Sequence, residues 1–123
     1  MNFVLVFLGG GIGATARYWM SGTIYRWSGG SFPYGTLAVN ALGCFIIGFL
    51  MTAFEERFLV TPSLRIFFTI GILGGFTTFS TFSFETISLI QDAEYYRAIG
   101  NIGLTLCSCL GGTYLGILLG RIL

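Results

Sequence analysis

Residues 71–85 read GILGGFTTFSTFSFE, and all of them except the final Glu85 belong to an uncharged run that begins at Ile66. The run, residues 66–84, is 19 residues long, and about 20 residues of helix cross the hydrocarbon core of a bilayer. Two adjacent glycines, Gly74 and Gly75, weaken a helix in the middle of this run. A break in lipid persists only where protein or water satisfies the freed backbone groups. The stretch therefore predicts a membrane-spanning helix that is broken mid-span.

Hydroxyl side chains crowd the residues that follow the glycine pair. Residues 76–84 contain five of them, Thr77, Thr78, Ser80, Thr81 and Ser83. A single Ser or Thr in a membrane helix commonly bonds to its own backbone. Five within nine residues, beside a helix break, favour a polar lining instead.

Aromatic rings accompany the hydroxyls. Phe76, Phe79 and Phe82 recur at a spacing of three, which places them on one stripe of a helix. Such a stripe usually serves packing, yet the positive edge of a ring can face an anion without fixing it in place. Glu85, which ends the motif, is predicted at the membrane interface or in a water-filled vestibule.

The composition of the whole chain requires a bilayer. Of its 123 residues, 54% are hydrophobic and only 9% are charged, whereas soluble domains carry about 25% charged residues. A chain this short and apolar could not cover its own surface with polar groups. The six basic residues are all arginines and form no stripe, which argues against nucleic acid as a partner.

Three further uncharged runs predict three more spans, and these are Met1–Ala16, Trp27–Phe54 and Ala98–Gly120. The predicted fold is an all-α membrane protein, one domain over residues 1–123. Its four transmembrane helices are expected at about 2–24, 33–55, 63–90 and 97–121. Short connections are expected at Tyr25–Ser31, Glu55–Thr61 and Gln91–Tyr96.

The first span is long enough only if Arg17 lies within it. Arg17 is then either a protein-facing residue inside the membrane or an interfacial residue that snorkels to the headgroups, and both alternatives stay open. The N-terminus lacks a positively charged region and a small-residue cleavage site, so we expect a span rather than a signal peptide.

The arginines give almost no orientation signal. With four spans, Arg57, Arg65 and Arg121 fall on the side of both termini, and Arg26 and Arg97 fall on the other. The tally is three against two, or against three if the arginine of the first span is added. The positive-inside rule needs an imbalance. The favoured hypothesis is dual topology, in which two oppositely inserted copies pair as an antiparallel homodimer. Two alternatives are that so few arginines balance by chance, or that a partner protein fixes the topology.

Glycines four residues apart predict close helix packing. They occur in the first span at Gly9 and Gly13, and in the fourth span at Gly112, Gly116 and Gly120. Helices in lipid associate mainly where small residues let their backbones approach. Packing is therefore the expected role of most glycines.

The cysteines and the missing histidines limit the possible chemistry. Cys44, Cys107 and Cys109 lie in apolar stretches and are interpreted as small hydrophobes. Cys107 and Cys109 point to different faces of a helix, so neither a disulfide nor a paired metal site is expected there. The chain has no His, and no nucleophile–base pair or metal cluster can be assembled, so no enzyme is predicted.

Polar residues also lie inside the second and fourth spans. The amide of Asn40 can donate to an anion. For Ser108 and Thr113, bonding to their own helix and a role in a polar path both stay open.

The chain resembles the Fluc (CrcB) family of fluoride channels over essentially its whole length. The most specific part is GGFTTFSTFS, Gly74–Ser83. Other positions that fit the family are Gly10, Gly13, Ala14 and Arg17, and then Gly35, Thr36, Leu37 and Asn40.

The resemblance implies a fluoride-selective channel with two pores in an antiparallel, dual-topology homodimer. Phe79 and Phe82 match the pore phenylalanines, and Asn40 matches the pore asparagine. Ser80 and Thr81 match hydroxyls that border the pathway.

Further positions follow from the same resemblance. Thr113 matches a polar residue of a hydroxyl track in the fourth span, where Ser108 is a further pore candidate. Cys109 stands where some relatives carry Ser. Glu85 matches a vestibule carboxylate, and Arg17 is assigned to the vestibule with it.

The resemblance also implies a structural sodium ion at the dimer two-fold. Its ligands would be backbone carbonyls that map to Gly74 and Thr77 of both subunits. The implied role is passive export of cytoplasmic fluoride, which protects against its toxicity, across the plasma (inner) membrane of a prokaryote.

Two other classes of membrane protein are alternatives. A small dual-topology multidrug transporter would need a carboxylate in its first span, and this first span has no Asp or Glu. A non-conducting accessory subunit would fit the balanced arginines and the glycines, but it leaves the hydroxyls beside the glycine pair unexplained.

Overall fold

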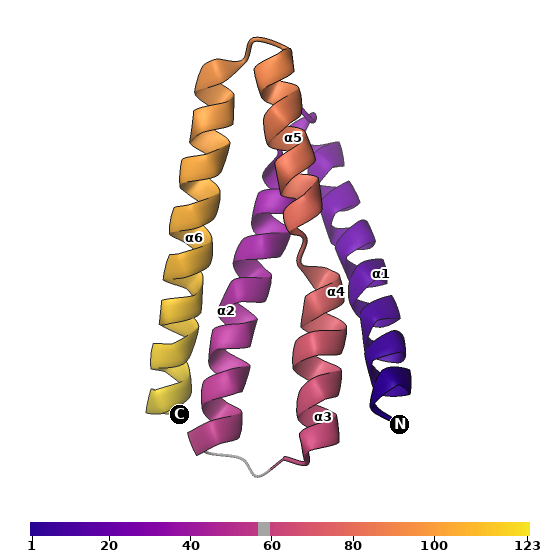
Figure 1. The fold of residues 1–123 in the computed structure, drawn as a ribbon. Helices are drawn as coiled ribbons and strands as arrows, with labels where there is room; N and C mark the ends of the chain where they lie inside the picture. The colour runs from indigo at the N-terminus through magenta and orange to yellow at the C-terminus, as the bar shows by residue number, and fades with distance from the viewer. Residues whose placement is uncertain (57–59) are drawn as a thin grey trace.

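A computed structural model describes residues 1–56 and 60–123 as a bundle of long helices (Figure 1). The helices are α1 (Asn2–Ser28), α2 (Tyr34–Glu56), α3 (Pro62–Ile66), the π-helical segment η1 (Phe67–Leu73), α4 (Gly74–Phe76), α5 (Phe79–Gln91) and α6 (Tyr95–Ile122). The described residues include no strand. Four helical stretches are long and apolar enough to cross a membrane: α1, α2, the composite Pro62–Gln91 and α6. The predicted all-α fold with four spans is confirmed.

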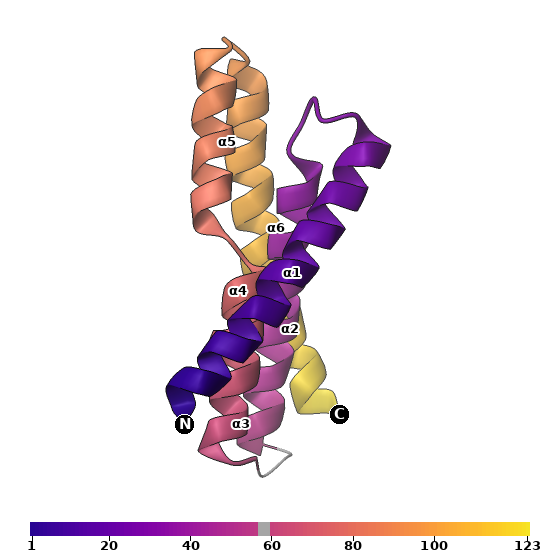
Figure 2. The same cartoon turned by 90° about the vertical axis from the view of Figure 1, so that its right-hand side faces the viewer.

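The third span changes its partner halfway along. Helix α2 packs along α6 and also contacts α1. The first half of the third span, α3 to α4, packs on α1, whereas its second half, α5, packs on α6. Figure 2 shows α1 running diagonally across the bundle, while α5 and the first part of α6 lie side by side at the upper left.

The outer surface is apolar, as lipid requires. Large side chains on α1, on the third span and on α6 are more than half exposed, among them Phe3, Phe7, Trp19, Ile70, Phe84, Leu110 and Tyr114. Exposure on this scale suits a protein whose solvent is hydrocarbon and not water.

Local signals in the sequence explain where the helices end. Gly29 ends α1 in the left-handed region, with φ 83°, and its N–H donates to the Tyr25 carbonyl. The first connection predicted at Tyr25–Ser31 was therefore wrong in its first part, because helix geometry continues to Ser28 until a glycine can adopt a positive φ. Thr61 caps α3 by accepting the Leu64 N–H, and Pro62 occupies the first helical position.

The interruption of the third span follows the glycine pair and does not coincide with it. Gly74 and Gly75 belong to helix α4, and Thr77 and Thr78 then adopt extended backbone before α5 begins. The prediction of one helical stripe through Phe76, Phe79 and Phe82 was wrong, because those two extended residues separate Phe76 from the other two rings.

Glycines hold the helices together, as the four-residue spacing predicted. A Cβ at Gly13 would overlap the Ile72 carbonyl oxygen of η1, and one at Gly9 would come within 2.8 Å of the Phe67 carbonyl oxygen. In α6, a Cβ at Gly116 would overlap the Phe45 carbonyl oxygen of α2. The packing role of these glycines is confirmed.

Both chain termini lie at the same end of the bundle as the end of α2 and the start of α3 (Figure 1). Two ion pairs lie at that end, Arg65–Glu55 at 3.1 Å and Arg121–Glu56 at 3.8 Å. Arg97 pairs with Glu94 at 3.3 Å at the opposite end. Arg57, which entered the orientation count, lies outside the described residues.

Candidate functional site

Asn40 completes the backbone hydrogen bonds that the interruption leaves open. Its Nδ2 donates to the Thr78 carbonyl at 2.9 Å, and its Oδ1 accepts the Thr78 N–H at 2.8 Å. Asn40 is 6% exposed, so this pairing replaces two helix bonds at a place that water reaches poorly. One side chain of α2 thus holds the extended segment of the third span.

A small hydroxyl network begins α5. The Thr78 hydroxyl accepts the Thr81 N–H at 3.2 Å and donates to the Thr81 hydroxyl at 3.1 Å. It also lies 3.2 Å from the Ser80 hydroxyl. Thr78 is therefore the N-cap of α5, and it gathers Ser80 and Thr81 at the positive end of the helix dipole.

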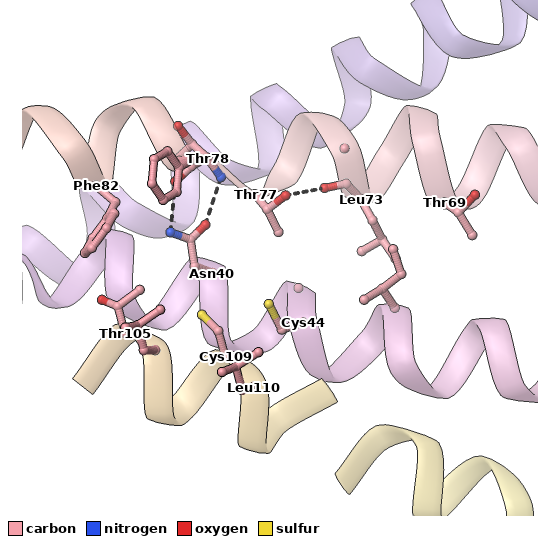
Figure 3. Close-up of a pocket in the computed structure, with 15 residues that line it drawn as sticks. Asn40, Cys44, Thr69, Leu73, Thr77, Thr78, Phe82, Thr105, Cys109 and Leu110 are labelled. Atoms are coloured by element: carbon pink, nitrogen blue, oxygen red, sulfur yellow. Dashed lines mark hydrogen bonds between the residues drawn. The ribbon is translucent and has the colours of Figure 1, made fainter. Parts of the chain in front are cut away.

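A cavity of about 400 Å³ opens beside the interruption (Figure 3). It is lined from α2, η1, α4, α5 and α6 by Asn40, Gly43, Cys44, Ile47, Thr69, Leu73, Gly74, Thr77, Thr78, Phe79, Phe82, Thr105, Leu106, Cys109 and Leu110. None of these residues is charged. Hydroxyl, amide and thiol groups interrupt a wall that is otherwise apolar.

The two phenylalanines of α5 differ in their surroundings. Their ring centroids lie 5.4 Å apart with an interplanar angle of 55°. Phe82 is 8% exposed, whereas Phe79 is 77% exposed in the single chain. The Phe82 ring therefore lies inside the chain, and the neighbouring Phe79 ring lies on its outer face.

Arg17 turns toward the protein and not toward the end of its helix. Its Nε donates to the Gly75 carbonyl at 3.0 Å, so it holds the last turn before the interruption. Of the two alternatives left open for Arg17, this contact favours the protein-facing one. The structure does not bring Arg17 to Glu85.

Glu85 belongs to a second, more polar cavity of about 340 Å³, which Tyr25, Ser88, Asp92, Glu94 and Arg97 also line. The Tyr25 hydroxyl donates to Glu85 Oε2 and lies 2.9 Å from the Thr36 hydroxyl. Glu85 Oε1 is buried without a hydrogen-bond partner among the described residues. The carboxylate is thus held between α1 and α5.

The two pore candidates of the fourth span, Ser108 and Thr113, do not line this cavity. Ser108 bonds to the Leu104 carbonyl of its own helix and does not line the cavity. Thr113 reaches across to α2 and donates to the Cys44 carbonyl at 3.2 Å, also outside the cavity lining.

Thr105 and Cys109 line the cavity instead, and sequence reasoning missed the first of them. Asn101, which is 1% exposed, lies one turn before Thr105 and donates to the Thr86 hydroxyl of α5 at 2.9 Å. The signal was present: Asn101, Thr105, Cys109 and Thr113 stand four residues apart, a single polar stripe on a helix.

Carbonyl groups near the interruption lose their usual helical donors. The N–H of Thr78, four residues after Gly74, donates to Asn40. The N–H of Thr81, four residues after Thr77, donates to the Thr78 hydroxyl. Oxygen donors of this kind fit a hard cation. Among the described residues, no group of three or more His, Cys, Asp or Glu side chains could hold a metal.

Four long apolar helices and an uncharged, polar-edged cavity at an interrupted span define a small multi-pass membrane protein. Residues 4–117 match the family described as CrcB-like protein, Camphor Resistance (CrcB). The chain belongs to this CrcB family.

Its relatives are similar over nearly their full length. A protein of Geobacter sulfurreducens is 47% identical over 91% of this chain and 90% of its own. One of Magnetococcus marinus is 45% identical over the whole of both chains. One of Citrifermentans bemidjiense is 47% identical over 99% of this chain and 98% of its own. All three bear the name fluoride-specific ion channel FluC.

Proposed function

We propose that this chain is a fluoride-selective channel that lets cytoplasmic fluoride leave the cell passively. The full-length similarity to proteins named as fluoride channels supports this. The observation that carries the proposal is the uncharged cavity in which Asn40, Phe79 and Phe82 meet at the interrupted third span. The bacterial relatives suggest the plasma (inner) membrane of a prokaryote as its location.

The chemistry of the cavity suits a small, strongly hydrated anion. An amide carries two N–H donors, and Asn40 gives one to the Thr78 carbonyl, so a second is left for an anion. Hydroxyl groups and ring edges add weak positive poles without a fixed charge, which allows the ion to leave again. A larger anion such as chloride would fit a narrow, donor-lined path poorly.

A passive channel is enough for the proposed role. Hydrogen fluoride crosses membranes as a neutral acid and dissociates in a less acidic cytoplasm, where the ion is trapped. An open path then lets fluoride leave down its gradient. No catalytic step is proposed.

The pore is proposed to need a second copy of the chain. In the single chain Phe79 is 77% exposed, and Ser80 and Gly74 are also exposed. Exposure of a polar hydroxyl to lipid in the middle of a span is unfavourable, so a partner subunit is expected to cover this surface. Near-equal numbers of arginines at the two ends support an antiparallel, dual-topology homodimer with two pores.

A structural sodium ion is proposed at the interruption, which we place in the middle of the membrane. The diverted donors at Gly74 and Thr77 support this, because both carbonyls keep lone pairs for a cation. Two carbonyls are too few for a complete coordination shell. The same two from a second copy would be needed, so the ion would tie the broken spans of the dimer together.

Glu85 and Arg17 are assigned to the approach to the pore. Tyr25 holds the Glu85 carboxylate at the wall of the more polar cavity, which is proposed as the vestibule. Arg17 acts there indirectly, since its bond to Gly75 fixes the turn that precedes the interruption.

Efflux from liposomes tests the proposal. Purified protein is reconstituted alone into vesicles loaded with potassium fluoride or potassium chloride, and anion release is followed with ion-selective electrodes after a potassium ionophore is added. We expect fast release of fluoride and only background release of chloride. Equal release of both anions would refute selectivity, and background release of both would favour an accessory subunit.

A further inference from the structure

Two of the three cysteines meet in the cavity. Cys44 of α2 and Cys109 of α6 both line it, and both are half-buried. Figure 3 shows both sulfur atoms among the side chains that line the cavity. The third cysteine, Cys107, is exposed and does not line the cavity.

The positions of the two thiols are fixed by tight backbone packing. A Cβ at Gly48 of α2 would overlap the Thr113 carbonyl oxygen, and Thr113 itself donates to the Cys44 carbonyl at 3.2 Å. On α6, a Cβ at Gly112 would lie 3.2 Å from the Ala41 carbonyl oxygen. Close contacts on both sides of Cys44 hold α2 and α6 in one register, so the backbone positions of Cys44 and Cys109 are fixed relative to each other.

Thiolates prefer soft metal ions. The groups around Cys44 and Cys109 limit which of these ions the pair can bind. No third His, Cys, Asp or Glu joins the two thiols in the part of the chain that the structure describes, so a tetrahedral zinc site is not available. Two thiolates and one divalent ion make a neutral complex, whereas a monovalent ion would leave a net charge in an apolar wall, which is costly.

We propose that Cys44 and Cys109 form a two-coordinate site for a soft divalent ion, with mercury(II) as its best representative. Each thiol gives its proton to water as a metal–sulfur bond forms. The bound ion joins α2 to α6 one helical turn from Asn40 and from Thr105. On the proposed function, it narrows the fluoride path and inhibits conduction.

The chain offers its own background for the experiment. Cys107→Ser leaves Cys44 and Cys109 as the only thiols, and it changes a residue outside the cavity, so its fluoride efflux should equal that of the wild type. Cys44→Ser and Cys109→Ser, each added to this background, leave one thiol. All three proteins are compared by gel filtration in detergent to show that they fold alike.

Binding is measured first, without reference to transport. Each protein is loaded with mercuric chloride, washed in increasing concentrations of a small monothiol, and analysed for bound mercury per chain. A preorganised pair benefits from its high effective concentration. We expect the C107S protein to keep one mercury ion per chain at a monothiol concentration on the order of 10-fold higher than that which strips either single-thiol protein. Equal loss from all three proteins would overturn the site.

Transport is measured second, on vesicles with and without mercuric chloride. We expect mercury to reduce fluoride efflux of the C107S protein several-fold, with recovery after a dithiol is added. Retained mercury with unchanged efflux would overturn the inhibition while leaving the binding site in place. Absence of fluoride efflux before mercury is added would count against the proposed function alone, because the binding measurement does not depend on it.

Discussion

Asn40 stands at the point where fold and proposed function meet. Its amide replaces both backbone partners of Thr78 and also lines the cavity. A hydrophobic residue could fill the same volume but could not satisfy an extended backbone segment inside lipid. The same property that stabilises the interruption therefore supplies a donor to the proposed ion path.

Replacing Asn40 should separate these two roles. Asn40→Leu leaves the Thr78 N–H and carbonyl without partners, which costs about 1–3 kcal/mol for each buried group, so both Tm and fluoride efflux should fall. Asn40→Asp keeps the acceptor for the Thr78 N–H but adds a negative charge to the cavity. Fluoride efflux should therefore fall strongly in this variant, whereas its Tm should fall less than that of Asn40→Leu. Thermal unfolding in detergent and vesicle efflux check this. Wild-type efflux from Asn40→Asp would contradict the assignment of Asn40 to the pathway.

Phe79 and Phe82 should respond alike in transport. Each is replaced by Ile, which removes the ring edge but keeps an apolar side chain. Fluoride efflux should drop for both variants, and Phe82→Ile should also lower Tm, because Phe82 is 8% exposed and packs inside the chain. Unchanged efflux in both variants would mean that the rings serve packing alone.

At the scale of the elements, the third span is two short helices with different partners. Its first half packs on α1 through glycines, and α5 packs on α6, where Asn101 donates to Thr86 at 2.9 Å. The extended residues Thr77 and Thr78 make this exchange of partners possible. The cavity lies where the two halves diverge, beside α2.

A pair of glycines in α6 tests the packing of the elements. Gly116→Ala places a Cβ against the Phe45 carbonyl oxygen, whereas Gly111→Ala meets nothing within 4 Å. We expect Gly116→Ala to destabilise the fold by about 1–3 kcal/mol, the range for overpacking. Gly111→Ala should be neutral or slightly stabilising, since Ala favours a helix. Equal Tm values for the two variants in detergent would contradict the packing of α6 on α2.

The sequence was sufficient for the four spans because length and hydropathy decide what a bilayer accepts. It was not sufficient for the position of the interruption. Gly74 and Gly75 carry the weakest helix propensity, yet they stay helical, and the chain opens at Thr77 and Thr78 instead. Asn40 explains this, because its amide pairs with Thr78 and with no earlier residue. A partner on another helix outweighed local propensity.

The candidate site was predictable only in part, because contacts between helices decide which side chains line the cavity. Asn40, Phe79 and Phe82 were proposed from the resemblance, and the structure brings them together, although their role in conduction stays a prediction. Ser108 was also proposed but bonds to its own helix. A lone hydroxyl does not show which face of α6 meets the cavity. The stripe through Asn101 and Thr105 does, since its four-residue period fixes the face.

At the scale of the whole molecule, the chain is proposed to act as one half of an antiparallel pair. Its termini share one end with the end of α2 and the start of α3 (Figure 1), and arginines lie at both ends of the bundle. With so little charge bias, either insertion is expected. Pairing of opposite copies would then cover the exposed ring of Phe79.

Added lysines should test this arrangement. Gln91→Lys with Tyr96→Lys puts two charges at the α5–α6 end, and Ile122→Lys with Leu123→Lys puts two at the opposite end; these residues are exposed. Each double variant alone should insert in one orientation and lose most fluoride efflux in cells. Co-expression of the two should restore efflux, and accessibility labelling of the lysines reports the orientation. Full activity of one variant inserted in one orientation would argue against antiparallel pairing.

The most direct measurement is the rate at which fluoride leaves vesicles that contain only this protein, compared with vesicles that contain Phe82→Ile and with protein-free vesicles. If the cavity beside the interruption is a fluoride path, wild-type vesicles empty fastest, and those with the variant approach the protein-free rate while chloride is retained in all three. Wild-type vesicles that release fluoride no faster than bare lipid would contradict the account.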